Sequence, residues 1–412
     1  MKKPSLPDPI RRQNVKGARL MKKGNSPGCS PVFVDTTLRD GGQSPGVFFD
    51  GPTKMAIVAA LDRIGVGEIE VGTPCLGQRE IEDLQVLLSM PVSAELFPWL
   101  RPVEEDFVAA MRLGFRRVHI SFPVSAGHMA SVWGSGMSGV LERVRKSVRK
   151  MSAEGCRVSV GMEDASRASM DFLQEFVEAV GMEGGIRVRY CDTVGCHHPA
   201  ELLERIGRIA GWGVPVEVHC HNDLGMATAN TVAAFHAGAD YLSTTVTGVG
   251  ERAGNAVMEE VAFALSFSGE GPVETGIDLP GLAHLSRWLH GVVGRSLSPY
   301  RPIVGSRIFQ HSSGIHVDGV IKNPANYELF PPDRVGAKRK IVVTHQTGKS
   351  GIRNVLERMG YRPSPEALER LVPRIREEGW RLKGIVPSQT ILNHFLSLLK
   401  ELDPGDSARQ GS

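Results

Sequence analysis

Short apolar segments and amphipathic helical segments alternate along most of the chain. Residues 32–37, Val-Phe-Val-Asp-Thr-Thr, are typical of a buried strand, and residues 51–65 place Ile57, Val58 and Leu61 on one helical face. Most later strands follow a glycine, which suits the left-handed end of a helix before a short loop. The pattern predicts strands near residues 32, 67, 92, 116, 156, 186, 214 and 240, with helices at 103–113, 138–153, 168–182, 199–211 and 224–237.

This alternation predicts an α/β fold, a (β/α)8 TIM barrel followed by a small, mostly helical C-terminal region. Eight strand–helix units within roughly 240 residues match such a barrel. A doubly wound open sheet is the alternative, but no Gly-x-Gly-x-x-Gly motif follows the first strand. We predict a catalytic barrel at residues 31–275 and a linker with a helical subdomain at 276–403. Within the latter, residues 278–297 have a helical pattern, whereas 300–350 lack regular periodicity.

The composition is that of an ordinary globular protein. The 412 residues are 41% hydrophobic and 23% charged, and no apolar run approaches the ~20 residues that a membrane span needs. Six cysteines without disulfide-framework spacing fit a reducing compartment, so we expect a cytoplasmic protein. Residues 1–30 carry a charge of +7, so the net charge of +3 leaves −4 for residues 31–412. We expect disordered tails at 1–30 and 404–412, and neither a nucleic-acid nor a membrane partner.

The predicted strand that begins near residue 214 ends in His-Cys-His. Because side chains at i and i+2 of a strand share one side, His219 and His221 project together. Two imidazoles on one side of a strand end are half of a metal site. They are also compatible with ordinary polar residues at a strand terminus.

Polar residues also follow the other predicted strands, where the functional side chains of a TIM barrel lie. Besides the two histidines, these residues are Arg39, Asp40, Gln43, Glu163, Asp164, Asp192, Thr193 and Asn255. One fold would bring them to one barrel mouth. We therefore predict a metal site of Asp40, His219 and His221, which the amide oxygen of Asn255 completes.

The predicted ligands combine imidazole nitrogens and a carboxylate without a thiolate. Such a set suits Mn²⁺, Mg²⁺, Fe²⁺ or Zn²⁺ with open positions, at which a 2-oxo acid can chelate. The cationic Arg39 could stabilise the oxyanion formed when the keto carbon is attacked, or alternatively form a structural ion pair. A thiolate zinc site from the cysteines and histidines of residues 191–198 and Cys220 is another alternative, but the spacing lacks Cys-x-x-Cys pairs.

Four motifs resemble those of a known enzyme superfamily. They are Asp-Thr-Thr-Leu-Arg-Asp-Gly at 35–41, His-Cys-His-Asn-Asp at 219–223, Gly-Glu-Arg-Ala-Gly-Asn at 250–255 and Ser-Gly-Ile-His at 313–316. The first three are similar to signatures of the DRE-TIM metallolyases. The fourth resembles their Claisen-condensing branch of isopropylmalate, citramalate and homocitrate synthases. The resemblance covers about residues 31–350 and is closest to the homocitrate synthases of nitrogen fixation, on residues 122–125, 161–168 and 314–319.

The resemblance implies a metal-dependent acyltransferase that condenses acetyl-CoA with 2-oxoglutarate to give homocitrate. The metal ligands of the superfamily correspond to Asp40, His219 and His221, with Asn255 at the fourth position. Its carbonyl-stabilising arginine corresponds to Arg39.

The remaining site residues are also implied by this resemblance. Glu163 and His316 correspond to an acid–base pair, with Tyr327 nearby. Gln43 and Thr193 correspond to substrate-contacting positions. In this family the partner subunit supplies the histidine that corresponds to His316, so the resemblance implies a homodimer with shared active sites.

Several departures from the family pattern leave the 2-oxo acid open. Gly42 stands where the family often has Glu, Cys220 and Asn222 replace residues that are commonly Ala and Asp, and 344–348 replace Gly-Lys-His-Ser-Gly. The alternatives are an isopropylmalate, citramalate or Re-citrate synthase, a carbon–carbon lyase of the same superfamily, and a non-catalytic homologue. The segment 300–350 with its histidine argues against the lyase, and the intact predicted site argues against the non-catalytic homologue.

Overall fold

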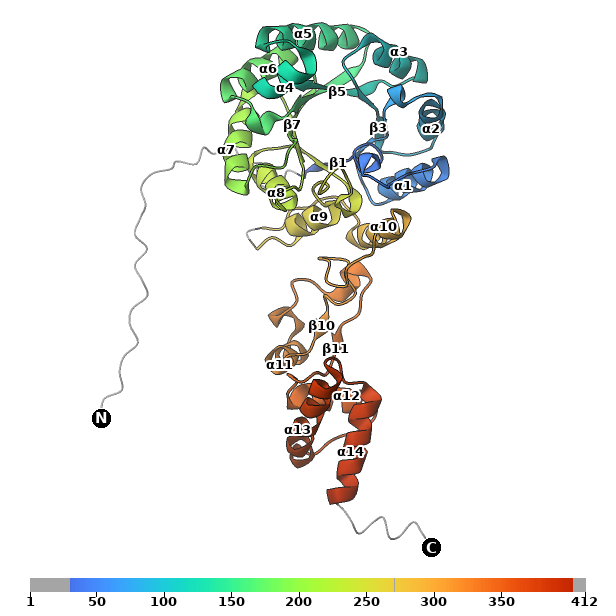
Figure 1. Ribbon diagram of the computed structural model, residues 1–412, viewed down its shortest axis with the longest axis vertical. Helices are drawn as coiled ribbons and strands as arrows, with labels where there is room; N and C mark the ends of the chain where they lie inside the picture. The colour runs from blue at the N-terminus through green and yellow to red at the C-terminus, as the bar shows by residue number, and fades with distance from the viewer. Residues whose placement is uncertain (1–29, 270, 403–412) are drawn as a thin grey trace, which may run out of the picture.

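A computed structural model describes residues 30–269 and 271–402 of the chain. Apart from Ser30, the tails expected at residues 1–30 and 404–412 lie outside the described residues. Figure 1 shows a ring of helices around a ring of strands, with a smaller, mostly helical region extending below it. Within the described ranges, no helix is both long and apolar enough to cross a lipid bilayer.

The strands form one parallel sheet in the order β3-β2-β1-β9-β8-β7-β6-β5-β4. They are β1 (Val32–Asp35), β2 (Glu68–Glu70), β3 (Glu95–Phe97), β4 (Trp99–Leu100), β5 (Arg117–Pro123), β6 (Arg157–Glu163), β7 (Arg187–Asp192), β8 (Val216–Cys220) and β9 (Tyr241–Thr244). Only Pro98 separates β3 from β4, so these are two parts of one strand that closes the ring. The predicted TIM barrel is confirmed, and the open-sheet alternative is wrong.

Helices surround the strands of the barrel. They are α1 (Gly51–Arg63), α2 (Gln78–Leu88), α3 (Glu104–Leu113), α4 (Ala126–Trp133), α5 (Met137–Ala153), α6 (Met170–Met182), α7 (Pro199–Ile209), α8 (Ala227–Ala237), α9 (Met258–Ser266) and α10 (Leu279–Val292). Local sequence sets their ends: the Asp50 side chain accepts a hydrogen bond from the Thr53 amide at the start of α1. Gly114 and Gly238 end α3 and α8 in the left-handed conformation, as the glycine pattern predicts. One of the helices, α4, lies at the mouth of the barrel.

The interior of the barrel is charged, whereas its outer face is apolar. On β7, Val188 and Tyr190 are buried in the hydrophobic cluster with the surrounding helices. Arg187 and Arg189 alternate with them and form ion pairs with Glu68 at 2.6 Å and Glu70 at 2.5 Å. Because β2 is not a neighbour of β7 in the sheet, these pairs cross the interior.

Glu217 on β8 joins the two arginines of this network. Its carboxylate lies 3.0 Å from Arg187 Nε and 2.6 Å from Arg189 Nε, and all three side chains are buried. Burying a charge costs several kcal/mol unless an opposite charge and hydrogen bonds compensate it. The interior charges therefore depend on one another.

The C-terminal region contains a second apolar core. Residues up to Val335 pack with the barrel cluster, and α12 (Lys349–Arg358), α13 (Pro365–Leu382) and α14 (Ser388–Leu402) form their own cluster. Between them lie β10 (Gln310–His311), α11 (Gly314–Lys322) and β11 (Lys340–Ile341). The expectation of an irregular segment at 300–350 is wrong for α11, because its apolar Val317 and Val320 are buried on one helical face. The domain division at residue 276 stays a prediction.

We expect Glu217→Leu to lower the free energy of unfolding by about 3–5 kcal/mol, because it removes one partner from two buried guanidinium groups. Urea unfolding followed by circular dichroism measures this. Lys150→Ala, which breaks the exposed pair with Glu104, is the control and should cost at most about 1 kcal/mol. A loss below about 1 kcal/mol for the Glu217 variant would show that the interior charges are not mutually dependent.

Candidate active site

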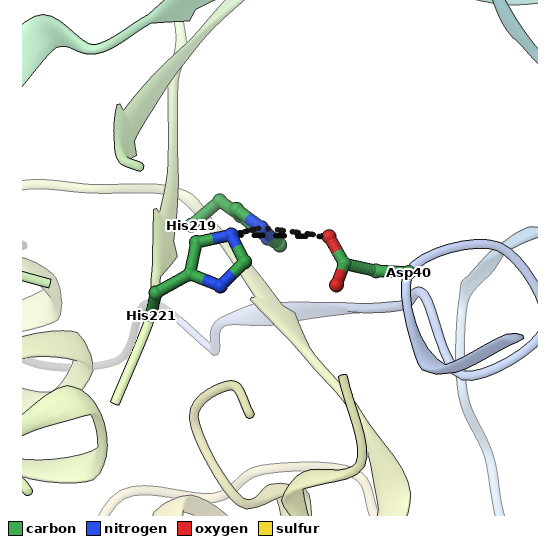
Figure 2. A group of neighbouring side chains, drawn as sticks. All are labelled: Asp40, His219 and His221. Carbon is green, nitrogen blue, oxygen red and sulfur yellow. Dashed lines mark hydrogen bonds and ion pairs between the residues drawn. The ribbon is translucent and has the colours of Figure 1, made fainter. Parts of the chain in front are cut away.

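Asp40, His219 and His221 meet at the barrel mouth, where β1 and β8 end. Figure 2 shows the two imidazoles and the carboxylate pointing toward one another. His219 Nε2 lies 3.3 Å from Asp40 Oδ2 and 3.3 Å from His221 Nε2, and the His221 Nε2 to Asp40 Oδ2 distance is 4.0 Å. One ligand atom from each residue lies within 4.8 Å of the other two, so the three could hold one metal ion.

The surroundings of these three residues fit a metal ion. All three are buried, and the set of two imidazoles and one carboxylate suits a divalent cation. Asn255 Nδ2 donates to Asp40 Oδ1 at 3.0 Å. Neither Asn255 Oδ1 nor His221 Nδ1 has a hydrogen-bond partner in the described part of the chain. The amide oxygen of Asn255 is therefore left without a protein partner among the described residues, beside Asp40.

Sheet register fixes the ring of His219. This residue pairs with Ser243 between β8 and β9, and its Nδ1 lies 2.9 Å from Ser243 Oγ. A partner on one ring nitrogen orients the other nitrogen toward the ligand set. Ser243 could not be identified from the sequence, because nothing in a sequence indicates which residue of the adjoining strand lies opposite His219.

Electrostatics keep Asp40 and His221 in the protonation states that a metal ion requires of its ligands. Burial raises the pKa of Asp40, but the Arg39 charge and a hydrogen bond with His219 outweigh this and hold the pKa well below its usual value. Burial and the neighbouring His219 lower the pKa of His221 to about 3. At neutral pH the carboxylate is therefore ionised and the His221 ring is neutral.

Arg39 is fixed beside the ligands by the charges inside the barrel. It donates from Nη1 to Asp40 Oδ2 at 3.0 Å and from Nε to the Glu70 carboxylate, which also binds Arg189. Burial raises the pKa of Glu70, but Arg189 and Arg39 lower it to about 2. The sequence analysis missed Glu70 and Arg189. The available signal was the alternation of Glu-Ile-Glu at 68–70 and Arg-Val-Arg at 187–189, which places like charges on one side of a strand.

The loop after β9 brings Asn255 to this centre. Gly254 has a φ of +92°, and a Cβ there would lie 2.0 Å from the Gly248 carbonyl oxygen, so only glycine fits. Arg252 pairs with Asp223 at 2.8 Å and donates to the Thr193 carbonyl at 2.5 Å. These contacts tie the loop to the segments that follow β7 and β8.

Glu163 lies at the end of β6, at the same mouth. Burial raises the pKa of its carboxyl group, although 42% of the side chain is exposed. The next residue, Asp164, has a φ of +62° and its amide donates to Thr193 Oγ1 at 2.8 Å. Gln43 Oε1 lies 3.5 Å from Arg39 Nη1. The predicted residues of the barrel thus lie at one end of it.

His316 and Tyr327 belong to the C-terminal region and not to the barrel. His316 is in α11, and its ring centroid is 4.4 Å from that of Tyr327. A Cβ on Gly319 would lie 2.4 Å from the Tyr327 ring, so this glycine lets the tyrosine pack against the helix. Figure 1 shows α11 outside the barrel ring. The described chain therefore does not bring this pair to its own ligand cluster.

The thiolate zinc alternative finds no support in residues 30–269 and 271–402. The one cluster there that could hold a metal is Asp40, His219 and His221. Cys191 and Cys220 are buried, and burial raises the pKa of Cys191 to about 12. A thiol with that pKa is a poor metal ligand.

Comparison with known proteins identifies the family. The HMGL-like family model matches residues 30–289. The chain belongs to this family. A homocitrate synthase post-HMGL domain-like model also matches residues 303–381. The predicted DRE-TIM superfamily is thereby confirmed.

Relatives of known name cover most of the chain. Homocitrate synthase 1 of Nostoc sp. is 39% identical over 92% of this chain and 99% of its own length. 2-Isopropylmalate synthase 2 of Caldanaerobacter subterraneus is 39% identical over 86% of this chain and 92% of its own. The solved structure of hydroxymethylglutaryl-CoA lyase from Pseudomonas aeruginosa is 20% identical, with a TM-score of 0.57 over 65% of this chain and 95% of its own. That last likeness shows the shared fold.

We expect His219→Ala and His221→Ala each to lower the metal content of the purified protein to a small fraction of wild type, because each removes one nitrogen ligand. Both residues lie at the mouth, so circular dichroism should show an intact fold. Elemental analysis by mass spectrometry measures the bound metal. His236→Ala, on the exposed side of α8, is the matched control and should retain it. Full metal content in both mouth variants would contradict the site.

Asp40→Asn tests whether the carboxylate is a direct ligand. The substitution keeps the shape of the side chain but removes its charge, so we expect the metal dissociation constant to rise by at least about 10-fold. Competition with a chelator of known affinity measures it. An unchanged dissociation constant would place Asp40 outside the ligand set.

Proposed function

We propose that the protein condenses acetyl-CoA with a 2-oxo acid in a metal-dependent Claisen reaction, with 2-oxoglutarate as substrate and homocitrate as product. The observation that carries this proposal is the convergence of Asp40, His219 and His221 next to the fixed cation Arg39. Its support is the chain-long similarity to homocitrate synthases and the match of residues 303–381 to the domain that follows the barrel in them.

The metal site and Arg39 act on the keto group of the 2-oxo acid, which is the electrophile of the reaction. A divalent ion held by Asp40, His219, His221 and Asn255 would supply Lewis-acid polarisation of the keto oxygen. The guanidinium of Arg39 stabilises the negative charge that this oxygen acquires, and its ion pair with Glu70 keeps it in place. Mn²⁺, Mg²⁺, Zn²⁺ and Fe²⁺ all suit this set of nitrogen and oxygen ligands.

The remaining residues move protons and hold the substrates. His316 accepts a proton from the acetyl methyl group, since an imidazole is a base suited to neutral pH, and Tyr327 supports its ring. The resulting enolate carbon bonds to the keto carbon, and water then cleaves the thioester to release CoA. Glu163, whose pKa burial raises, acts with His316 as the acid–base pair. Gln43 and Thr193 contact the 2-oxo acid.

An assay of CoA release with a panel of 2-oxo acids tests the proposal. We expect the highest kcat/KM with 2-oxoglutarate, and release with another acid instead would assign an isopropylmalate, citramalate or Re-citrate synthase. No release with any acid by metal-loaded protein would reject the condensation. Cleavage of a hydroxyacyl-CoA would then favour the lyase, which the match at residues 303–381 argues against.

We propose a homodimer in which α11 of one subunit covers the barrel mouth of the other. The support is that α11 lies outside its own barrel ring, and that apolar side chains on α11 and in the segment after it are exposed. Ile315 is 77% exposed, Leu329 is 73% exposed and Tyr327 is 43% exposed. Such a surface is typical of an interface. We further propose that the protein acts in the cytoplasm, in amino-acid biosynthesis or nitrogen fixation, without nucleic-acid or membrane partners.

Complementation between inactive variants tests the shared site. His316→Ala should lose condensation yet bind metal and 2-oxo acid. Asp40→Ala should lose activity because it removes a residue proposed to hold the metal ion. After subunit exchange in an equal mixture, half of the dimers are mixed and each has one complete site, so about a quarter of wild-type activity should return. Exchange is verified with differently tagged subunits. If mixed dimers form and no activity returns, His316 serves its own barrel or is not the base.

A further inference from the structure

Helix α4 places an imidazole, His128, beside the proposed acid–base residue Glu163. Ser125 precedes the helix, and its Oγ accepts a hydrogen bond from the His128 amide at 3.3 Å. Only 27% of the His128 side chain is exposed. Its Nδ1 atom is removed from solvent and has no hydrogen-bond partner in the described part of the chain. An imidazole nitrogen that loses water without gaining a partner costs free energy, so its position calls for a reason.

Two carboxylates face this nitrogen. His128 Nδ1 lies 3.9 Å from Glu163 Oε1 and 4.0 Å from Asp164 Oδ2. Asp164 is already engaged, because Arg167 Nε donates to both of its oxygens at 2.8 and 3.0 Å and Ser125 Oγ donates to it as well. Among the described residues, His128 is the one ion-pair partner of Glu163 within 4.0 Å.

We propose that His128 is a positioning residue, which holds the Glu163 carboxylate in place by a hydrogen bond from Nδ1 while Glu163 exchanges a proton. A movement of about 1 Å brings the 3.9 Å separation to hydrogen-bond length. Ser125 connects α4 with the residue next to Glu163, because its Oγ accepts from the His128 amide and donates to Asp164. This inference rests on the proposed function, in which Glu163 takes part in proton transfer.

The charges around His128 and Glu163 determine how removal of the His128 side chain changes the pKa of Glu163. Burial raises the pKa of Glu163, His128 lowers it, Asp164 raises it and Arg39 lowers it. On the side of α4, Arg143 of α5 stacks over Trp133, with its guanidinium carbon 4.8 Å from the ring centroid. Removing His128 therefore raises the pKa of Glu163 further. The limb of the pH–rate profile that Glu163 controls moves to higher pH, whether the reaction needs its ionised or its protonated form.

The test compares His128→Ala and His128→Asn with wild type. We expect His128→Ala to lower kcat by about 10- to 100-fold, the range of groups that orient a reacting residue, with the KM for the 2-oxo acid changed by less than about 3-fold. In His128→Ala, the limb of the pH–rate profile that Glu163 controls should move to higher pH. In His128→Asn the amide nitrogen occupies the place of Nδ1, so part of kcat should return while the pH limb stays displaced. His236→Ala, an exposed histidine at the end of α8, should behave as wild type.

A merely structural role would give a different result. It would lower the thermal unfolding temperature of both variants and leave the pH limb of the folded enzyme in place. An unchanged kcat, or a limb that stays or moves to lower pH, overturns the proposal.

A second measurement separates this inference from the proposed function. Infrared difference spectra between each protein and its Glu163→Gln counterpart follow the Glu163 carboxylate through a pH titration without turnover. We expect a higher midpoint in His128→Ala than in wild type. If wild type releases no CoA, the proposed function fails, while an equal midpoint in both proteins rejects the role of His128.

Discussion

The arrangement of the barrel mouth depends on the ion pairs that the Glu70 carboxylate forms. This carboxylate lies buried at the end of β2 and binds both Arg189 of β7 and Arg39 in the loop after β1. A buried carboxylate costs several kcal/mol unless opposite charges compensate it, and two guanidinium groups do so here. Through this contact the charged interior reaches the mouth, where Arg39 in turn lowers the pKa of Asp40.

The consequence is a site whose charges are set before any substrate arrives. Arg39 lies between Glu70 and Asp40, so little rotation remains to it. Preorganised charges of this kind stabilise a developing oxyanion without reorganising during the reaction. Ser243 orients the His219 ring in the same way. Apolar packing of the strands' outer faces against the helices holds this arrangement, which leaves the interior and the mouth free for polar groups.

The two halves of the proposed chemistry lie on different parts of the chain. The barrel carries Glu163 and the three residues that could hold a metal ion, whereas α11 carries His316 on a segment outside the barrel ring. The arrangement fits a reaction in which one substrate is held by the metal site and the other is deprotonated from outside. Ile315 and Tyr327, which adjoin His316, are both exposed.

The sequence by itself determined the barrel and the common side of His219 and His221 on their strand, because both rest on local patterns. Strand and helix periods, glycines that end helices, and the i, i+2 spacing of His219 and His221 act over a few residues. Only the tertiary structure decided the pairing of Glu70 with Arg189, 119 residues away, and the approach of His128 to Glu163. It also showed that His316 lies in a helix. Such contacts depend on how the closed barrel brings distant strands across its interior and sets neighbouring loops side by side, which no local pattern encodes.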